Sequence, residues 1–400
     1  MNHFDIRIAL VDDSHAILMM LTANLKELGY KNIDVYRSAS AALDSIQLLS
    51  LKYDAIFTDL NMPVIDGMEF IRILGKQAYQ GGIVIVSEMD KRVISLASDL
   101  ARKGMTHLIG NLPKPISIEN LTAVLGKLHL FLQKGVQSNL ELTEDELLNA
   151  ITGNQITPFY QPKIDSKTNR VSSIEVLARI VRPQDLQPIS PSAFIPVAEK
   201  YDLINLLTFQ LFEKSTADHS RLIQTLDHDF KTAINLSSIQ LKDLDCPNKL
   251  GIILDIYDLN SSQIILEITE EHALDSPEQL ETLNRLRMRG FGLSLDDFGT
   301  GFTNLNQLRT LPFTEIKIDR SLISGIHNDP FSQTIVNALV DLSEKQKIDL
   351  VAEGIELFEE LEFLQNYDKN ILMQGYLISK PKPIEELLKW HQVWQKSVID

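Results

Sequence analysis

Hydrophobic and polar positions along the chain follow two successive patterns. From residue 6 to about residue 115, short apolar runs such as "IRIALVDD", "YDAIFTDL" and "GIVIVSE" alternate with stretches of helical periodicity, for example residues 14–28. This alternation is typical of a parallel sheet that is covered by helices. The first pattern therefore predicts a doubly wound α/β domain.

An amphipathic helix and a polar segment follow this domain. Apolar residues recur there at steps of three and four: Ile118, Leu121, Leu125, Leu128 and Leu132. Gly135 is expected to end the helix, and the polar stretch "KGVQSNLEL" is expected to be a linker. We therefore predict a first domain over 1–134, a linker over 135–142 and a second domain over 143–400. Thr143 and Glu146 have the spacing of a capping box, which predicts a new helix start.

The second pattern repeats eight times. Its apolar runs are "PFYQPKI", "SSIEVLARI", "TAINLS", "QIILEITE", "GLSLDDF", "TEIKIDR", "DLVAEGI" and "ILMQGYLIS". Helical stretches, including 194–213, 276–290, 331–347 and 356–366, separate most of them. Eight strand and helix repeats over about 260 residues predict a TIM-like (β/α)₈ barrel. In such a barrel the carboxyl ends of the strands meet at one mouth.

Each of the eight runs carries a polar residue near its end. The expected ring consists of Glu175, Asn235, Glu267, Asp296, Asp297, Lys317, Glu353 and Gln374. These runs contain no histidine, which argues against zinc, whereas oxygen ligands suit Mg²⁺ or Mn²⁺. Two ions roughly 3.5–4 Å apart, bridged by one aspartate of the adjacent pair, would compensate the carboxylates and form a phosphoryl-transfer site.

The residue types in this ring suggest separate roles. Lys317 would stabilise charge that develops on a phosphate, and Glu353 would orient or deprotonate the attacking water. Arg179 would hold a second phosphate with its planar guanidinium. The ring thus predicts metal-dependent hydrolysis of a phosphodiester.

Polar residues also end the apolar runs of the first domain. Asp12 and Asp13 close the first run, Asp59 closes the third, and Ser87 and Lys114 follow later runs. Because strand ends line the ligand crevice of an open parallel sheet, we expect these groups to meet. They would form a Mg²⁺ site in which Asp59 accepts a phosphoryl group.

These residues resemble the receiver domains of response regulators. The resemblance rests on the acid pair, on "DLNMPVIDG" beginning at Asp59, on Ser87 and on the "KP" pair at Lys114. It implies a flavodoxin-like fold, Asp59 as phosphoacceptor, a sensor histidine kinase as partner, and a switch formed by Ser87 and Lys114. It also implies one Mg²⁺ held by Asp12, Asp13 and the backbone carbonyl of Asn61. Leu108 stands where this family usually has an aromatic residue, and about three extra residues precede Lys114.

The second half resembles the EAL-domain phosphodiesterases of cyclic di-GMP. The motifs are "QPKI", "EVLAR", "FIPVAE", "NLS", "LEITE", "LDDFGTGF", "IKIDR", "VAEGIE" and "QGYLISKP", with "EVL" in place of the signature "EAL". The resemblance implies a barrel whose first strand is antiparallel and hydrolysis of cyclic di-GMP to linear pGpG.

Carried over to this chain, the family pattern assigns a role to each matching residue. The implied metal ligands are Glu175, Asn235, Glu267, Asp296 and Asp297. The implied catalytic residues are Glu353, Lys317, Asp297 and Glu175. The implied substrate contacts are Gln161, Leu177, Arg179 and Gln374. Glu270 is expected to anchor the loop "FGTGFTNL", which in the family also contributes to dimer contacts, so a homo-oligomer is expected.

Composition narrows the partners. Lys and Arg total 38 against 54 Asp and Glu, a net charge of −16, which disfavours DNA and RNA. No apolar run reaches the roughly 20 residues of a membrane span, so no membrane association and a cytoplasmic location are expected. Two alternatives stay open at this stage: a receptor that binds the nucleotide without cutting it, and an interaction protein whose receiver competes for a kinase's phosphoryl group.

Overall fold

The computed structural model describes residues 6–48, 52–77, 79–88, 106–138, 142–183, 185, 187–226, 230–269, 274, 276–299 and 305–399. The chain divides into two compact units, Met1–Leu140 and Glu141–Asp400. The predicted domain edges at 134 and 143 stay predictions. The expected helix end at Gly135 was wrong, because the helix continues to Ser138. One glycine costs a helix only about 1 kcal/mol, which a helix of 21 residues tolerates.

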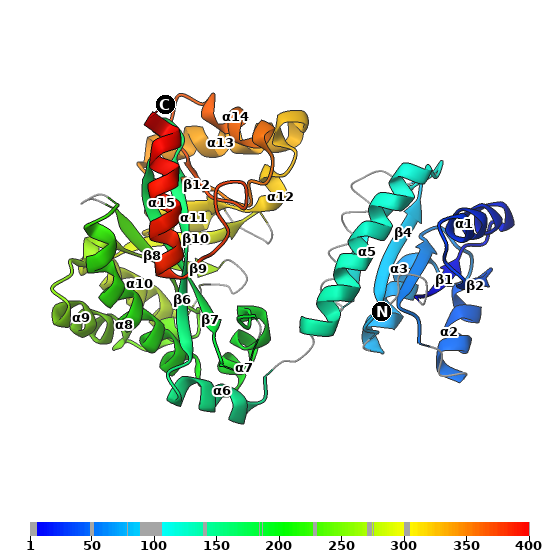
Figure 1. Cartoon of the computed structure of the whole chain (residues 1–400), viewed down its shortest axis with the longest axis horizontal. Helices are drawn as coiled ribbons and strands as arrows, with labels where there is room; N and C mark the ends of the chain where they lie inside the picture. The colour runs from blue at the N-terminus through cyan, green and yellow to red at the C-terminus, as the bar shows by residue number, and fades with distance from the viewer. Residues whose placement is uncertain are drawn as a thin grey trace. The chain divides into compact units, whose positions relative to one another are not determined.

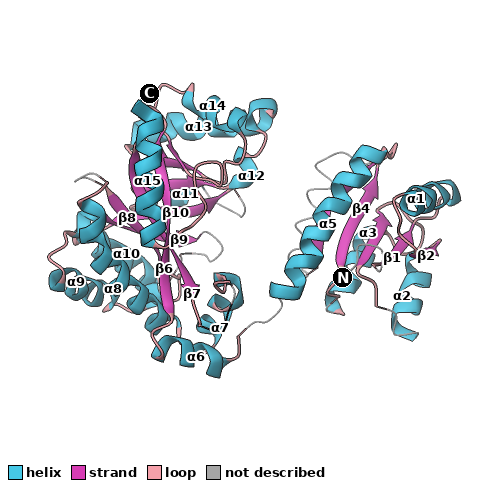
Figure 2. Cartoon of the chain, in the orientation of Figure 1, coloured by secondary structure: helices cyan, strands magenta, loops and turns pink. Residues whose placement is uncertain are grey.

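The first unit contains a five-stranded parallel sheet with strand order β2-β1-β3-β4-β5, whose strands are magenta in Figure 2. Its strands are β1 Arg7–Val11, β2 Asn32–Tyr36, β3 Ala55–Asp59, β4 Gly82–Ser87 and β5 His107–Pro113. Its described helices are α1 His15–Glu27, α2 Ala39–Leu48, α3 Gly67–Lys76 and α5 Ile118–Ser138. Apolar residues of α1 and α5 form one core and those of α2 and α3 another. The predicted doubly wound, flavodoxin-like fold is confirmed.

Strand β5 contains an irregularity near its start. Leu108 pairs with Ile83 but Gly110 pairs with Val84, so Ile109 is an extra residue in the ladder. A bulge of this kind admits one additional residue without disrupting the rest of the pairing. It accommodates part of the unusual length that precedes Lys114 in the sequence.

The second unit is a closed barrel of eight strands in the order β10-β11-β12-β13-β6-β7-β8-β9 (Figure 1). Its strands are β6 Ile156–Asp165, β7 Val171–Ile180, β8 Lys231–Asn235, β9 Ile264–Thr269, β10 Gly292–Phe298, β11 Glu315–Ile318, β12 Asp349–Ala352 and β13 Leu372–Met373. Strand β6 runs antiparallel to both neighbours, and the other pairs are parallel. The predicted TIM-like barrel with one antiparallel strand is confirmed.

Helices surround the barrel and connect its strands. They are α6 Glu144–Thr152, α7 Ile195–Lys200, α8 Ile204–Ile223, α9 Cys246–Ile256, α10 Pro277–Met288, α11 Leu305–Thr310, α12 Arg320–Ile323, α13 Pro330–Gln346, α14 Phe358–Gln365 and α15 Ile384–Ile399. Short 3₁₀ turns add η1 Pro191–Ala193, η2 Gln240–Lys242, η3 Ser261–Gln263 and η4 Ile326–Asn328. Helix α15 packs beside β6 (Figure 1). The predicted capping box of Thr143 and Glu146 at the start of α6 is confirmed.

One predicted helix is two. The stretch 194–213 was expected to be continuous, but it is broken between α7 and α8, where Asp202 has a φ of +59°. A left-handed backbone conformation cannot continue a right-handed helix. The prediction was wrong because the apolar periodicity of the two helices runs on across the break.

The barrel has an apolar core between its strands and helices, and it also buries charged side chains. A single cluster of buried aliphatic and aromatic residues joins the strands to the surrounding helices. Five charged side chains are also buried on the strands: Lys163, Glu175, Glu267, Glu315 and Lys317. Buried charges are costly unless they are paired, so this cluster points to a functional site.

Among the described residues, no helix has both the length and the apolar character needed to cross a membrane.

Candidate active site and phosphoacceptor site

The strands of the barrel bring the predicted ring together. Glu175 and Glu267 lie within β7 and β9, and Lys317 lies within β11. Asp296 and Asp297 lie just before the end of β10, Asn235 ends β8, and Glu353 and Gln374 directly follow β12 and β13. Register explains the convergence, because Glu267 pairs with both Asn235 of β8 and Ser294 of β10. Neighbouring strands thus present their polar residues at adjacent levels.

Lys317 lies at the centre of the carboxylates. Its Nζ is 2.7 Å from Glu353 Oε1, 3.0 Å from Asp296 Oδ1 and 3.0 Å from Glu267 Oε2. A fourth carboxylate, Glu175, is 3.6 Å away through Oε2. Although burial opposes charging, the surrounding carboxylates hold the pKa of Lys317 well above its usual value. The ammonium group is therefore charged and positioned where an anionic phosphate would need it.

Side-chain amides orient Glu175 from two directions. Asn235 Nδ2 donates to Glu175 Oε1 at 3.1 Å, and Gln374 Nε2 donates to Glu175 Oε2 at 2.6 Å. Gln374 also donates to Gln161 Oε1 at 3.1 Å, while Gln161 Nε2 donates to the carbonyl of Ser379 at 2.9 Å. In this structure Gln161 therefore fixes Gln374, and Gln374 fixes Glu175.

Negative charge exceeds positive charge in the ring. Burial, and next the charge of Glu267, raise the pKa of Glu175 to about 7. Burial, together with the charge of Asp296, raises the pKa of Glu353 to about 8 against the opposing effect of Lys317. Burial also opposes ionisation of Glu267, but Lys163 and Lys317 outweigh it and hold the pKa of Glu267 at about 2. Cations are the natural compensation for such a site.

The donor set fits divalent metal ions. Carboxylate oxygens of Asp296, Asp297 and Glu353 lie within 4.8 Å of one another. Strand β10 changes register between Leu295 and Phe298, and Asp297 has a φ of +59°. This local distortion turns the side chains of two consecutive aspartates toward the same region, where a regular strand would send them to opposite faces. Hard oxygen donors of this kind bind Mg²⁺ or Mn²⁺.

A cavity of about 480 Å³ adjoins the ring. Glu175, Asn235, Asp296 and Asp297 line its polar end. Its other walls are mainly apolar and come from β7, η1, α7 and α8: Val176, Leu177, Ala178, Pro191, Ile195, Pro196, Ile204, Leu207 and Leu211. Leu177, a predicted substrate contact, thus lies beside the metal-binding groups. A cavity with one apolar side and one anionic, metal-binding side suits a ligand that carries both rings and phosphates.

One predicted substrate contact, Arg179, is partnered outside the ring. The Arg179 guanidinium lies over the ring of Phe159 at 5.7 Å, and Nη1 donates to the carbonyl of Ala178 at 2.8 Å. Burial lowers the pKa of Arg179 from its usual value. Glu270 and residues 300–304 of the predicted loop lie outside the described residues.

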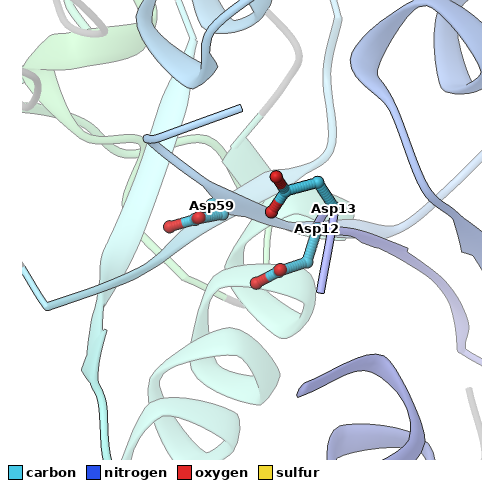
Figure 3. Close-up of side chains that lie close together, drawn as sticks. All are labelled: Asp12, Asp13 and Asp59. Atoms are coloured by element: carbon cyan, nitrogen blue, oxygen red, sulfur yellow. The ribbon is translucent and has the colours of Figure 1, made fainter. Parts of the chain in front are cut away.

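The acidic residues of the first unit also meet. Figure 3 shows Asp12, Asp13 and Asp59 close together, and their carboxylate oxygens lie within 4.8 Å of one another. Lys114 Nζ is 2.8 Å from Asp12 Oδ2 and 3.4 Å from Asp59 Oδ2. Lys114 also donates its backbone N–H to the carbonyl of Ser87 at 3.2 Å. The five predicted residues at the strand ends therefore form one site.

Local backbone contacts fix Asp59 in this site. The N–H of Leu60 donates to Asp59 Oδ1 at 2.9 Å, which leaves Oδ2 toward Lys114. Gly67, at the start of α3, packs so closely that an added Cβ would lie 2.2 Å from the Asp59 carbonyl oxygen. Burial raises the pKa of Asp59, while Lys114 acts in the opposite direction. Asn61, whose carbonyl is the third expected ligand of the cation, follows two residues later and is exposed.

Sequence reasoning missed two charged residues of the barrel interior. Lys163 on β6 and Glu315 on β11 are both buried, and each belongs to the network around Glu267. The available signal was a period of two: Lys163 stands two residues after Gln161, and Glu315 two residues before Lys317. Residues two apart on a strand share a face, so both had to point into the barrel.

The fold and these two sites define a signalling protein in which a phosphoacceptor domain is joined to a metal-binding hydrolase barrel. Comparisons with known proteins agree. Residues 8–126 match the response regulator receiver domain, and residues 144–381 match the EAL domain. The chain belongs to the EAL family and carries a receiver domain before its EAL domain.

Relatives of known name share parts or most of this organisation. Cyclic di-GMP phosphodiesterase RocR of Pseudomonas aeruginosa is 30% identical over 84% of this chain and 86% of its own length. Probable cyclic di-GMP phosphodiesterase PdeG of Escherichia coli is 36% identical over 63% of this chain and 50% of its own length. The solved structure of the PaMucR phosphodiesterase in complex with c-di-GMP is 33% identical over 61% of this chain and 98% of that chain, with a TM-score of 0.56.

Proposed function

We propose that this protein is a response regulator whose barrel hydrolyses one phosphodiester bond of cyclic di-GMP and releases linear pGpG. The observation that carries the proposal is the carboxylate ring around Lys317 beside a cavity of about 480 Å³. Membership of the EAL family and the names of relatives such as RocR support the same substrate. The proposed substrate has two phosphates and two guanine rings, which suits the two sides of the cavity.

We assign two divalent ions, Mg²⁺ or Mn²⁺, to Glu175, Asn235, Glu267, Asp296 and Asp297. When bound, such ions supply Lewis acidity toward a phosphate and make water a better nucleophile near neutral pH. Lys317 then stabilises the charge that develops on the phosphoryl oxygens. Glu353, next to Lys317 and Asp296, orients the attacking water and accepts its proton.

The remaining predicted residues bind or orient the substrate. Leu177 contributes to the apolar wall of the cavity, where a guanine ring would lie. Gln374 and Gln161 keep Glu175 in place through the chain of amide hydrogen bonds. Arg179 is assigned to a substrate phosphate, and Glu270 to the anchoring of the following loop.

The first unit supplies regulation. We assign Asp59 as phosphoacceptor, with one Mg²⁺ held by Asp12, Asp13 and the carbonyl of Asn61, and Ser87 and Lys114 as the residues that respond to the phosphoryl group. A sensor histidine kinase is the proposed donor. Homo-oligomer formation and a cytoplasmic location stay predictions.

A receptor that binds cyclic di-GMP without cutting it is the main alternative. Loss of a metal ligand, of the lysine or of the base would favour it. All eight predicted ring residues are present in the sequence and lie in the described part of the barrel. This completeness supports the enzyme over the receptor.

Hydrolysis by the purified full-length protein tests the proposal. The wild type is incubated with cyclic di-GMP and Mg²⁺ or Mn²⁺, and the products are separated by chromatography. We expect metal-dependent formation of pGpG, loss of activity by about 10²-fold or more in Glu353→Gln, and no loss in the control Glu359→Gln, which changes an exposed acid on α14. Tight binding of cyclic di-GMP without any product would instead establish the receptor.

A further inference from the structure

Lys163 of β6 has no role in the proposed reaction, yet it contacts one of its metal ligands. Its side chain is completely buried, and its Nζ lies 2.6 Å from Glu267 Oε1. The other carboxylate oxygen of Glu267, Oε2, lies 3.0 Å from Lys317 Nζ. Glu267 is therefore held by two ammonium groups, one on each oxygen.

The partner of Lys163 on its other side is Glu315. The distance from Lys163 Nζ to Glu315 Oε1 is 3.2 Å, and Glu315 is also buried. Glu315 lies two residues before Lys317 on β11, so it faces the barrel interior one level below the ring. The ion pair of Lys163 and Glu315 thus forms a charged layer directly beneath Glu267.

We propose that Lys163 is a positioning residue, which fixes the orientation of the Glu267 carboxylate so that it can serve as a metal ligand. This inference rests on the proposed metal-dependent function of the barrel. Partners that orient a metal ligand from behind commonly contribute 10–100-fold to metal affinity. Glu315 holds the Lys163 ammonium in place and balances its charge.

Electrostatics and positioning predict opposite effects on metal binding, which makes the inference testable. If charge alone acted, removal of the Lys163 ammonium near the metal site would tighten the binding of the metal ion. Deleting a positioning group weakens it, because Glu267 then loses one of the two contacts that define its orientation. In the double variant Lys163→Met with Glu315→Gln, one positive and one negative charge are removed, so the net charge of the layer is unchanged.

The measurement is the stabilisation of the full-length protein by Mn²⁺, followed by tryptophan fluorescence during thermal unfolding. Both tryptophans of the chain, Trp390 and Trp394, lie in α15 of the barrel, so Mn²⁺ bound to the first unit does not dominate the signal. The wild type, Glu315→Gln and the double variant are titrated with Mn²⁺. Replacement of a buried ion pair by neutral groups is often tolerated in folding, which makes the double variant the informative one.

We expect the double variant to need roughly 10-fold or more Mn²⁺ than either the wild type or Glu315→Gln for the same rise in unfolding temperature, because stabilisation by a ligand of the folded state depends on its concentration relative to its dissociation constant. An equal or lower Mn²⁺ requirement in the double variant would overturn the inference, because Lys163 would then contribute only packing or charge. A purely structural role lowers the unfolding temperature without Mn²⁺ but leaves the Mn²⁺ requirement unchanged. Hydrolysis by the wild type is measured in parallel: a wild type that binds Mn²⁺ but forms no product refutes the proposed function and leaves the role of Lys163 to be decided by the titration.

Discussion

Stabilisation of the barrel by Mg²⁺ should increase with pH, because two carboxyl groups of the ring, one proposed metal ligand and the proposed base, have raised pKa values in the metal-free protein. The pKa of Glu353 is raised from 4.5 to about 8 and that of Glu175 from 4.5 to about 7. A carboxyl whose pKa is raised by folding stabilises the folded state fully below the unfolded pKa. That contribution is lost as pH rises through the folded pKa. The metal-free barrel therefore loses stability between about pH 5 and pH 8.

The size of the effect follows from the two pKa values. Between about pH 5.5 and pH 8, a group that shifts from 4.5 to about 8 loses about 3 kcal/mol of stabilisation. A group that shifts from 4.5 to about 7 loses about 2 kcal/mol over the same range. Because a proton on one carboxyl eases ionisation of the other, the combined loss lies at roughly 3–5 kcal/mol. Bound Mg²⁺ would remove this loss, since its positive charge favours the ionised forms of both carboxyl groups and releases their protons.

The assay compares the unfolding temperature with Mg²⁺ and with a chelator at each pH, again by tryptophan fluorescence. Taking the difference between the two conditions cancels the contributions that titratable groups remote from the ring make to stability. One such group is His219: burial lowers its pKa to about 4, so its contribution to the stability of the fold increases as pH rises. For a barrel of this size, about 3 kcal/mol corresponds to roughly 6–12 °C. The Mg²⁺ effect should be larger by that amount at about pH 8 than at about pH 5.5.

The variant Glu353→Gln serves as the matched control, because its amide resembles the neutral carboxyl and cannot ionise. We expect it to flatten most of the pH dependence of the Mg²⁺ effect. A Mg²⁺ effect that is equal at both pH values, or larger at the lower one, would refute the reasoning. It would mean that the excess negative charge of the ring is not what the metal compensates.

Three further predictions concern the phosphoacceptor, the barrel backbone and the substrate. A small-molecule phosphoryl donor should add one phosphoryl group to the wild type but none to Asp59→Asn, as measured by intact mass. The control Asp44→Asn, which alters an exposed acid, should be phosphorylated like the wild type. Retained phosphorylation of Asp59→Asn would place the acceptor elsewhere. Gly375→Ala should lower the unfolding temperature of the barrel, since the added Cβ would lie 2.1 Å from the carbonyl oxygen of Ile355. Forcing such a fit costs about 1–3 kcal/mol of stability. An unchanged unfolding transition in tryptophan fluorescence would contradict this prediction. Arg179→Ala should raise KM for cyclic di-GMP about 10-fold or more with a smaller change in kcat. The reason is that a charge-assisted hydrogen bond to phosphate contributes about 1.5–3 kcal/mol to binding. An unchanged KM would exclude that contact.

Much of the fold was predictable because the period of the apolar pattern determines the type of each element. Eight apolar runs with polar ends sufficed for the barrel, and parallel topology then placed residues as distant as Glu175 and Glu353 at one mouth. The antiparallel direction of β6 came from the family resemblance, since periodicity carries no information on strand direction. The same holds for the individual roles of the ring residues, which no pattern of hydrophobicity assigns.

The errors arose where backbone conformation departs from what side chains indicate. The break between α7 and α8 depends on the left-handed conformation of Asp202, and the apolar pattern continues across it. Gly135 was read as a helix end, although its modest cost is spread over a long helix. Lys163 and Glu315 were missed because only the polar residues near the ends of the runs were considered, whereas period-two alternation places both side chains in the barrel interior.

The entry of the chain into the barrel unit provides a physical link between the linker and the cavity. The N–H of Leu142 donates to the carbonyl of Ala193 at 3.0 Å, and helix α6 packs against α7. Ala193 ends the turn η1 and is followed directly by Phe194 and α7, and Ile195 in α7 lines the cavity. The proposed metal ligands lie instead on strands of the closed barrel, each of which is hydrogen-bonded to a neighbour on both sides. A displacement of the linker would therefore act first on the apolar wall of the cavity. Regulation by this route would change how the substrate fits before it changed how the metal ions are held.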